Sequence, residues 1–478
     1  MIGAHRADPS LAMNRFVSIL AAFSIFSAMA GADEAVTRVS SLRELAEAAA
    51  GNNRTITMEP GVYRMADYLT EPVLEAIRAG VDRNLSRPPV PMFVFRGDSN
   101  RINLTGVTVE IDTGLYQKVP QDGYTRCLIV AGKGNRIAGL SIRNTGPENQ
   151  GSNGNILSVA GEGNTLENIT LSVCGSYPFG YGDLLGKGGP GLVPLQKQSG
   201  IQVLGDRSVL RHCKVSSRAF GHCFYIQDGS DIRIEDCHAE GVTRGTTEML
   251  GDKDGPAFDN GFRSVYLNRD GFYQIVGGYT KSLTEDGFRT YGSAGTVTLA
   301  GCTATNTRAG FEIGNKDDSP KKTLVENCAA RGCERAFLLG SNVVLRRCSG
   351  DITHGPLLYL RGGRNSDIEL ELAAGPPVST VHALATIAGT GHRVTLHGPG
   401  AADAGPGLPI LLGYGMPDHA EMSSPIRPAE ARDIQLTNNL AEVTVVTGEL
   451  ATGCTVRSAT PKRSITGPDL QTPPKGEW

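Results

Sequence analysis

The stretch from Thr284 to Gly292, TEDGFRTYG, places two carboxylates, an arginine and a tyrosine around one phenylalanine. Four other stretches share its form: GHCFYIQ, DNGFRSV, RAGFEIG and ERAFLLG. They align Phe224, Phe262, Phe288, Phe311 and Phe337 in one column. Side chains alternate along a strand, so an inward phenylalanine column implies an outward column one residue later. That outward column consists of Tyr225, Arg263, Arg289, Glu312 and Leu338.

The outward column predicts a polar face with mixed charge. Neighbouring coils of a parallel solenoid lie ~4.8 Å apart, so the polar part of the column would extend over roughly 14 Å. Further candidates lie beside it: Gln227 and Tyr291 two residues on, His222 and Asp286 two residues before the phenylalanines, and Tyr266 if the strand bulges near Ser264. Such a face suits an extended anionic ligand, of which an acidic polysaccharide is one kind.

These residue types could cleave a uronic-acid chain by β-elimination. The reaction needs a cation that neutralises the sugar carboxylate, a base that takes the C5 proton, and an acid that protonates the departing O4. Arg263 and Arg289 are candidate carboxylate partners, because a guanidinium can hold a carboxylate through two hydrogen bonds. The candidate bases and acids are His222, Tyr225, Lys281 and Tyr291.

Structural roles compete with these assignments. Glu312 could pair with the arginines of its column, His222 could be a strand-end histidine, and Lys281 could be a surface residue in a turn. Tyr225 and Tyr291 are the better acids if their rings face solvent.

A long insertion follows the coil of Cys237, and long loops beside a rigid face commonly carry binding residues. Arg244 and Glu248 in this insertion are candidate substrate-binding residues, together with Gln227, Tyr266, Asp286, Tyr291 and Glu312. The carboxylates of Asp252, Asp254 and Asp259 could also bind Ca²⁺. Their spacing does not match an EF-hand, so no metal ligand is assigned and no cofactor is required.

A repeat of cysteines organises the middle of the chain. VLRHCKV, IRIEDCHA, YQIVGGYT, VTLAGCTA, TLVENCAA and VVLRRCSG align five cysteines and Gly278, with spacings of 24, 41, 24, 26 and 20 residues. A period of this length is typical of a solenoid coil, and the spacing of 41 indicates a coil with an insertion. Stacked inward thiols pack as small apolar groups, so we expect buried free cysteines and no necessary disulfides among the 10 cysteines.

The two ends of the chain differ from the repeats. MNRFVSILAAFSIFSAMAGADEA has an arginine, a short apolar run and small residues after it, which is the layout of a secretory signal peptide starting at Met13. We therefore predict a leader over residues 1–32, a single β-helix domain over 33–458 and a flexible tail over 459–478. The mature protein is expected to be secreted or periplasmic, without membrane insertion once the signal is removed.

The net charge of the chain limits the kinds of partner that it can bind. The formal net charge is -3 over 478 residues, so there is no basic excess to displace the counterions of a nucleic acid. We expect no nucleic-acid partner, an anionic polysaccharide as substrate, and a monomer.

Residues 41–63 are expected to form a helix followed by a strand. Ser41 and Glu44 fit a capping box, and TITMEPGVY follows as a strand and turn. This segment resembles the N-terminal cap of right-handed parallel β-helix proteins. A solenoid needs such a cap, because its first coil would otherwise expose the core. The predicted fold is therefore all-β, a right-handed parallel β-helix with a short N-terminal capping helix.

The cap, the cysteine and phenylalanine columns and the block HCFYIQDGSDIRIEDCHAEGVTRGTTEML together resemble the β-helix polysaccharide lyases, from about Val36 to Ser458. The resemblance is to alginate-lyase-like members of polysaccharide lyase family 31 and more distantly to chondroitinase B. It implies a Tyr and a Lys or Arg on the β-helix face as the eliminating groups, with Tyr225 and Arg263 or Lys281 at the matching positions. The ligands of a chondroitinase-B-like calcium site are not evident.

The sequence thus favours a lyase that cleaves an alginate-like uronate polysaccharide by β-elimination. A glycoside hydrolase would instead place two carboxylates about the bond, and Asp252, Asp254, Asp259 and Asp286 could supply such a pair. A C5-epimerase uses nearly the same groups as a lyase. A carbohydrate-binding solenoid without activity would explain the repeat but not the clustering of ionisable groups.

Overall fold

The computed structural model describes residues 36–85, 88–149, 153–187, 191–314, 321–398, 407–416, 422–458 and 463–464. The predicted leader, and all of the predicted tail except the backbone of Arg463–Ser464, lie outside these residues. The described chain belongs to one unit that starts at Val36. No helix among the described residues is long and apolar enough to cross a bilayer.

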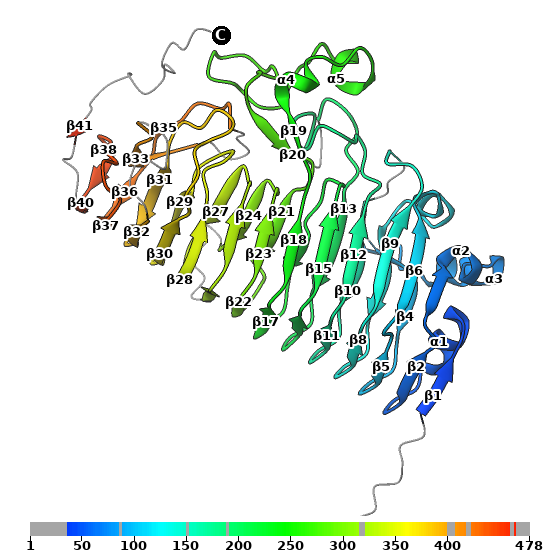
Figure 1. Cartoon of the computed structure of the whole chain (residues 1–478). Coiled ribbons are helices and arrows are strands. Elements are labelled where there is room, and N and C mark those ends of the chain that lie inside the picture. The colour runs from blue at the N-terminus through cyan, green and yellow to red at the C-terminus, as the bar shows by residue number, and fades with distance from the viewer. Residues whose placement is uncertain are drawn as a thin grey trace, which may run out of the picture. The chain divides into compact units, whose positions relative to one another are not determined.

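The unit is a right-handed parallel β-helix, as the sequence predicted, in which successive coils add strands to three parallel ladders (Figure 1). The first ladder consists of β1 (Val36–Val39), β2 (Thr55–Met58), β5 (Arg101–Asn103), β8 (Arg136–Ala138), β11 (Thr165–Glu167), β14 (Val209–Arg211), β17 (Ile232–Glu235), β22 (Val297–Ala300), β25 (Thr323–Glu326), β28 (Val343–Gly350), β30 (Asp367–Leu372), β32 (Arg393–His397), β37 (Gln435–Asn438) and β40 (Thr455–Ser458). The second consists of β3 (Gly61–Arg64), β6 (Val107–Asp112), β9 (Ser141–Thr145), β12 (Thr170–Val173), β15 (Lys214–Ser217), β18 (His238–Glu240), β23 (Thr303–Thr305) and β26 (Ala329–Arg331), and it merges with the first at β28.

The third ladder, called here the site sheet, carries the residues of functional interest. Its strands are β4 (Pro89–Phe95), β7 (Tyr124–Val130), β10 (Gly154–Val159), β13 (Gln198–Val203), β16 (Phe224–Ile226), β21 (Asp286–Thr290), β24 (Ala309–Ile313), β27 (Arg335–Leu339), β29 (Leu358–Arg364), β31 (Ala385–Thr390), β33 (Ile410–Leu412), β38 (Val445–Thr447) and β41 (Arg463–Ser464), with β36 (Ala431–Arg432) and β39 (Ala451–Thr452) at one side.

The N-terminal end of the solenoid is covered by short helices. They are α1 (Leu42–Ala48), α2 (Met65–Tyr68) and α3 (Glu71–Gly80), and a 3-10 helix, η1 (Thr113–Lys118), follows β6. Ser41 caps α1 by accepting a hydrogen bond from the Glu44 backbone N–H, as predicted. The Glu44 carboxylate accepts a hydrogen bond from the backbone N–H of Ser40 rather than of Ser41, so the second hydrogen bond of the capping box is shifted by one residue. Leu42 and Leu45 turn inward onto the first coil.

The interior confirms the predicted phenylalanine column in four of its five members. Phe224, Phe288, Phe311 and Phe337 are fully buried and stack nearly parallel, with ring centroids 4.9, 5.0 and 5.1 Å apart. The rings follow the coil spacing because each lies in register with the next. Phe262 is not a member, since β16 pairs directly with β21.

The cysteine column is confirmed with one correction. Cys237 is followed one coil later by Cys302, because β17 pairs with β22, and Gly278 lies outside the column. All 10 cysteines are free and nine are buried. The residue before each column cysteine has positive φ, from 50° to 65°, at His212, Asp236, Gly301, Asn327 and Arg347. These left-handed residues make the tight corner between the first two ladders, and the conformation favours Gly, Asn and Asp.

The stretches GKGN (132–135) and GEGN (161–164) form tight turns in the early coils, with positive φ at Gly134 and Gly163. The asparagines that end these turns form a ladder with Asn100 of the preceding coil: the backbone N–H of Asn100 donates to the Asn135 side chain and that of Asn135 donates to Asn164, at 2.9 and 2.8 Å. In the late coil the ring of His392 takes the same role toward the backbone of Ser366.

Two excursions leave the coils beside the site sheet. The first joins β12 to β13, and its described parts are residues 174–187 and 191–197. The second joins β18 to β21 over residues 241–285 and contains the antiparallel pair β19 (Thr243–Gly245) and β20 (Thr280–Ser282) with α4 (Thr246–Met249) and α5 (Gly255–Asp259) between them (Figure 1). The excursions share an apolar cluster that includes Tyr181, Leu184, Met249 and Tyr266. The insertion is therefore longer than the sequence predicted, because YQIVGGYT belongs to it and not to a coil.

We expect the stacked rings to contribute strongly to stability. Phe311→Ala should reduce the free energy of unfolding by about 3–5 kcal/mol, because it removes the middle of the stack and leaves a cavity. Phe272→Ala is a matched control, since the Phe272 side chain is 65% exposed and surface substitutions cost within about 0.5 kcal/mol. Denaturant unfolding measures both. Equal losses in the two variants would contradict the structural role of the stack.

Candidate active site

The outward column of the site sheet holds most of the residues that the sequence singled out. Tyr225 lies in register with Arg289, and Arg289 with Glu312. The column continues through Leu338 and Tyr359. It is not a solvated face, however, because Tyr225 and Glu312 are each only 3% exposed.

Arg263 does not belong to this column. The predicted alignment of DNGFRSV with the coil strands is wrong: Phe262 lies in the second excursion and has a φ of 54°. Arg263 is exposed and forms an isolated bridge with Gln274 there. Its catalytic role stays a prediction that no contact with the column supports.

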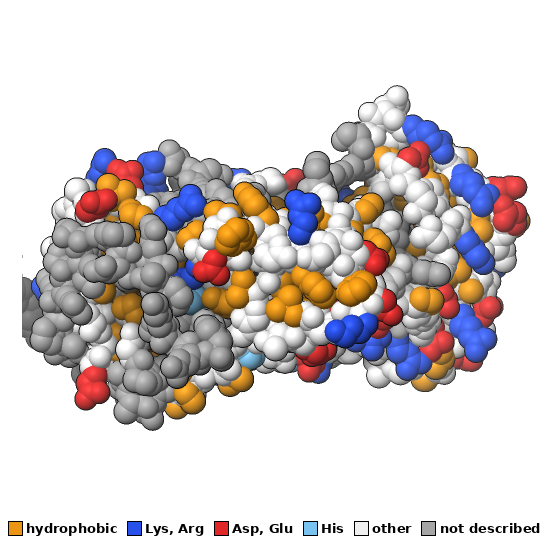
Figure 2. Space-filling view, turned by 90° about the horizontal axis from the view of Figure 1, so that it is seen from above, with side chains coloured by type: hydrophobic (Ala, Val, Ile, Leu, Met, Phe, Trp, Pro, Cys, Tyr) orange, Lys and Arg blue, Asp and Glu red, His pale blue; other side chains and the backbone are white. Residues whose placement is uncertain are grey.

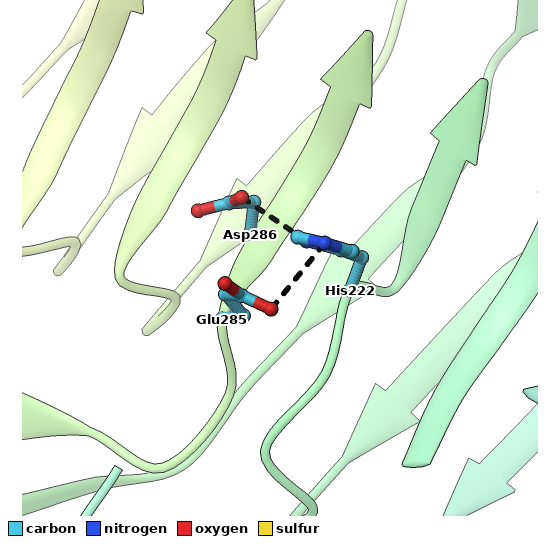
Figure 3. A group of neighbouring side chains, drawn as sticks. All are labelled: His222, Glu285 and Asp286. Carbon is cyan, nitrogen blue, oxygen red and sulfur yellow. Dashed lines mark ion pairs between the residues drawn. The ribbon is translucent and has the colours of Figure 1, made fainter. Parts of the chain in front are cut away.

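Histidine 222 lies at the centre of the polar cluster, immediately before β16. Its Nδ1 is 3.0 Å from Asp286 Oδ2, and its Nε2 is 3.3 Å from Glu285 Oε2 and 2.7 Å from the hydroxyl of Tyr291. Figure 3 shows the imidazole between the two carboxylates, which come from the next coil at the start of β21. The three side chains are almost completely buried, and the Tyr291 ring is partly exposed.

A buried arginine holds the carboxylates of this cluster in place. Arg308, which is 2% exposed, contacts Asp183, Glu285, Asp286 and Glu312 at 3.0 to 3.5 Å. Arg308 thereby connects the first excursion, through Asp183, with two neighbouring coils.

These cations keep the carboxyl groups ionised. Burial alone would raise the pKa of Asp286, but the charge of Arg308 and the contacts with His222 and Arg289 hold that pKa well below its usual value. For Glu285 the opposing burial is outweighed by His222, Lys197 and Arg308, which lower its pKa to about 2. The pKa of Asp183 is likewise lowered despite burial, by Lys281 and Arg308.

Lys281 and Tyr266 lie inside this network rather than at the surface. The Lys281 ammonium is fully buried, 2.6 Å from Asp183 Oδ1 and 2.8 Å from Glu334 Oε2. The Tyr266 hydroxyl donates to Asp183 at 2.7 Å. Lys281 was interpreted as a candidate base or a surface residue in a turn; its surroundings are those of a structural ion pair.

Arg289 is anchored by the same carboxylates but remains partly accessible. Its Nη1 pairs with Glu312 Oε1 and lies 3.4 Å from Asp286 Oδ2, and its guanidinium stacks over the Tyr291 ring with 4.6 Å to the centroid. Arg361, from β29, also contacts Glu312 Oε1, at 2.8 Å. One buried carboxylate therefore holds two partly exposed guanidinium groups.

Three phenols lie beside the cluster: Tyr124 and Tyr291 are half-buried, and Tyr225 is almost completely buried. The hydroxyls of Tyr124 and Tyr225 are 3.2 Å apart, and the Tyr225 ring lies 5.4 Å from His222 and 6.3 Å from Tyr291. Burial is the largest cause that raises the pKa of all three, so the phenols are protonated at neutral pH.

Arg126, on β7, was not singled out from the sequence. It lies close to Tyr124 and Tyr225, and burial lowers its pKa while these tyrosines oppose the shift. Among the residues that the structure describes, Arg126 forms no ion pair, and its Nε has no hydrogen-bond partner. It is thus a half-buried cation without a protein anion beside the phenols.

The remaining candidates lie apart from His222. Gln227 accepts a hydrogen bond from Gln202 at 2.8 Å at the exposed end of β16. Arg244 pairs with Glu248 and Asp252 on the second excursion, at 2.8 and 2.6 Å, and its guanidinium stacks on Tyr181.

Neither group of possible metal ligands in the described residues fits Ca²⁺ well. Asp252 is already held by Arg244 and by the Tyr181 hydroxyl, while Asp254 and Asp259 are exposed. Within the described ranges, the one group with metal-ligand geometry is His222, Glu285 and Asp286. Its two carboxylates are neutralised by Arg308, and Lys197 contacts Glu285 at 2.8 Å. Ca²⁺ prefers six to eight oxygen ligands, so we derive no step through a metal ion.

No protein-family model and no curated protein sequence matches the chain. Solved structures with similar coils include a rhamnogalacturonan lyase, with 11% identity, a TM-score of 0.39 and coverage of 89% of this chain and 79% of that one. An endo-xylogalacturonan hydrolase from Aspergillus tubingensis has 10% identity, a TM-score of 0.37 and coverage of 90% and 95%. An alginate lyase has 10% identity, a TM-score of 0.37 and coverage of 91% and 86%. These likenesses are distant, so the function must be argued from the chain's own contacts.

The cluster predicts a specific loss of stability in acid. Glu285 has a lowered folded-state pKa, so its contribution is complete above about pH 4.5 and disappears as the pH falls toward about 2. Glu285→Gln should reduce stability by roughly 1–3 kcal/mol at neutral pH, and its unfolding curve should approach that of the wild type near pH 2. Denaturant unfolding across this range measures the difference. Glu75→Gln, at an exposed carboxylate, is the control, and a difference for Glu285→Gln that is constant with pH would contradict the assignment.

Proposed function

We propose that the protein cleaves a uronic-acid polysaccharide by β-elimination on the site sheet. The observation that carries the proposal is the contact chain from Asp286 through His222 to the hydroxyl of Tyr291. It ends at a partly exposed phenol with the guanidinium of Arg289 over the phenol ring, and Arg126 lies beside the next two phenols, Tyr225 and Tyr124.

The chain of contacts suits reversible proton storage. We assign the proton of the neutral imidazole to Nδ1, 3.0 Å from the ionised Asp286, so that Nε2 accepts the proton of Tyr291. When Nε2 takes that proton, the imidazolium lies between two carboxylates and the phenolate lies under a guanidinium. Both charges formed in the transfer are thus met by fixed opposite charges, which is how a preorganised site stabilises a developing ion pair.

The elimination then balances within the site. The Tyr291 phenolate takes the C5 proton, and the electron pair of the C–H bond forms the C4=C5 double bond as the C4–O4 bond breaks. The departing O4 takes the proton from Tyr291, and His222 returns its stored proton to the phenolate. The net transfer is one proton from C5 to O4, and no other reactant is consumed.

Arg126 is the cation that we assign to the substrate carboxylate. Arg289, Arg308 and Arg361 are each paired with buried carboxylates, whereas Arg126 has no such partner in the described chain. An unpaired, partly buried charge is unfavourable, and a sugar carboxylate would remove that penalty while the C5 proton becomes more acidic. The predicted carboxylate partner Arg289 acts instead on the phenol.

The cluster suits hydrolysis less well. A glycosidase needs a carboxylic acid whose pKa is raised so that it can protonate the leaving oxygen. The pKa values of Asp183, Glu285 and Asp286 are all lowered. Proton donors on the accessible side are therefore phenols. An epimerase would share the base and differ in its product, and a polysaccharide substrate agrees with the predicted export.

A polymer panel tests the reaction class. Alginate, polygalacturonate, glucuronan and dermatan sulfate are each incubated with the protein, and the ultraviolet absorbance of the unsaturated product is followed. We expect a rise with one polymer and a loss of about 10²–10⁴-fold in rate for Tyr291→Phe, with an unchanged melting temperature because the ring and its stacking remain. New reducing ends without absorbance would indicate a hydrolase instead, and retained activity in Tyr291→Phe would exclude the proposed base.

The role of Arg126 is tested separately. Arg126→Gln should lower kcat/KM by about 10²–10³-fold, and Arg126→Lys should recover part of the loss because it restores the charge without the two-pronged geometry. Arg136→Gln is the matched control, since Arg136 is exposed on β8 of the first ladder. Steady-state kinetics on the responsive polymer measure all three. Equal activity of Arg126→Gln and Arg136→Gln would remove Arg126 from the mechanism.

A further inference from the structure

A hollow lies between the second excursion and the segment before β31. It has a volume of about 430 Å³ and is lined by Thr247, Arg269, Tyr279, Thr380, His382 and Ser423, with Asp270 at its side. A pocket of this size can hold a sugar ring, since small-molecule sites occupy about 300–1,000 Å³. None of these residues takes part in the proposed elimination.

Arg269 has hydrogen-bond donors without acceptors in this hollow. Its Nε and Nη2 are buried and have no hydrogen-bond partner, and Arg269 forms no ion pair with any carboxylate that the structure describes. The hydroxyl of Ser423 is also without a partner. Leaving buried polar groups without partners is costly, so an anionic or polar ligand in this hollow would offset that cost.

The other titratable groups in the hollow do not supply that anion. Burial and the charge of Arg269 lower the pKa of His382 to about 3, so its imidazole is neutral at neutral pH, and its Nε2 lies 2.8 Å from the Tyr279 hydroxyl. Asp270 is exposed and does not pair with Arg269. The hollow therefore has one buried positive charge and one negative charge at the solvent side.

An exposed aromatic ring lines the hollow beside this one. Phe272 is 65% exposed and lines a neighbouring hollow that shares Asp270, Val276 and Gly277 with the first. Seen from the side on which the excursion projects, hydrophobic side chains reach the surface in the central part of the face (Figure 2). A ligand that spans the two hollows would meet the apolar ring of Phe272 in one and the guanidinium of Arg269 in the other.

We propose that this hollow, called here the Arg269 subsite, binds a carboxylate-bearing sugar ring, with Arg269 on the carboxylate and Phe272 against the ring. Thr386, which lines an adjoining small cavity with Arg269, lies in the outward column four coils beyond Arg289. Four coil steps amount to roughly 19 Å. A single sugar cannot touch both places, whereas a polymer along the site sheet can. This placement as a distal subsite rests on the proposed function; binding of the acidic sugar does not.

Calorimetric titration with uronate oligomers of increasing length tests the subsite without turnover. The protein carries Tyr291→Phe, and the oligomers come from the polymer that the wild type cleaves, or from polygalacturonate if it cleaves none. We expect affinity to increase with length and Arg269→Gln to remove that increase, a loss of about tenfold or more for long oligomers and none for short ones. Phe272→Ala should lower the affinity for long oligomers in the same way, and Asp270→Asn should raise that affinity.

Two controls distinguish binding at the subsite from a general effect of surface charge. Lys253→Gln removes an exposed cation from the same excursion and should leave the length dependence unchanged, and carboxyl-reduced oligomers should not show it. Arg269→Gln could bind oligomers of every length with the same affinity as the Tyr291→Phe parent and differ from it only in a lower melting temperature. Arg269 would then have a structural role beside buried water, and the subsite proposal would fail even if the wild type cleaves the polymer. If no polymer is cleaved but Arg269→Gln still removes the length dependence, the subsite stands and the lyase proposal fails.

Discussion

The structure around the candidate site depends on one buried ion network. Arg308 joins carboxylates from the first excursion and from two coils, and Lys281 joins Asp183 to Glu334. Removing one member of such a network leaves an uncompensated buried charge, which is far more costly than replacing the whole set by apolar groups. The network therefore fixes the excursions on the site sheet. It also keeps Asp286 ionised, 3.0 Å from Nδ1 of His222.

The parallel coils supply this network with its geometry. A solenoid places one residue from each coil in each column, so a functional group is positioned by its neighbours in register rather than by a single loop. His222 and Asp286 both lie two residues before a stacked phenylalanine, on adjacent coils, and Glu285, Arg308 and Glu334 each lie three residues before one. The phenylalanine stack thus fixes where the charged residues of the network lie along each coil. Rigid apolar rings inside the coil position charged groups at its edge.

The fold could be predicted because its signals are periodic. Inward cysteines and phenylalanines return once a coil, and a short amphipathic helix precedes the first strand. The exception was Phe262, whose NGFR context imitates the coil motif within an excursion, because a local match carries no information about which strand is its partner. The site was predicted in part: His222, Tyr225, Asp286, Arg289, Tyr291 and Glu312 lie together. The burial of Lys281, a candidate base for which the alternative was a surface position, was missed, since burial by an excursion from elsewhere in the chain leaves no local pattern. Glu285 and Arg308 could have been found from their shared offset before the phenylalanines. Arg126 and Tyr124 could not, because their coil lacks the motif.

The arginines of this face fall into two groups that their partners distinguish. Arg289, Arg308 and Arg361 converge on Glu312, and their charges are matched within the protein. Such arginines orient other protein groups, and their charges are already paired, so they are poor partners for an anionic ligand. Arg126 and Arg269 are also removed from water in part, but neither has an acidic partner among the described residues, and burial lowers the pKa of both. Desolvating a guanidinium without an anion is unfavourable, so a folded protein tolerates it where an external anion completes the site. Arg126 lies on β7 of the site sheet and Arg269 on the second excursion beside that sheet, and a polymer with a carboxylate on successive units could meet both.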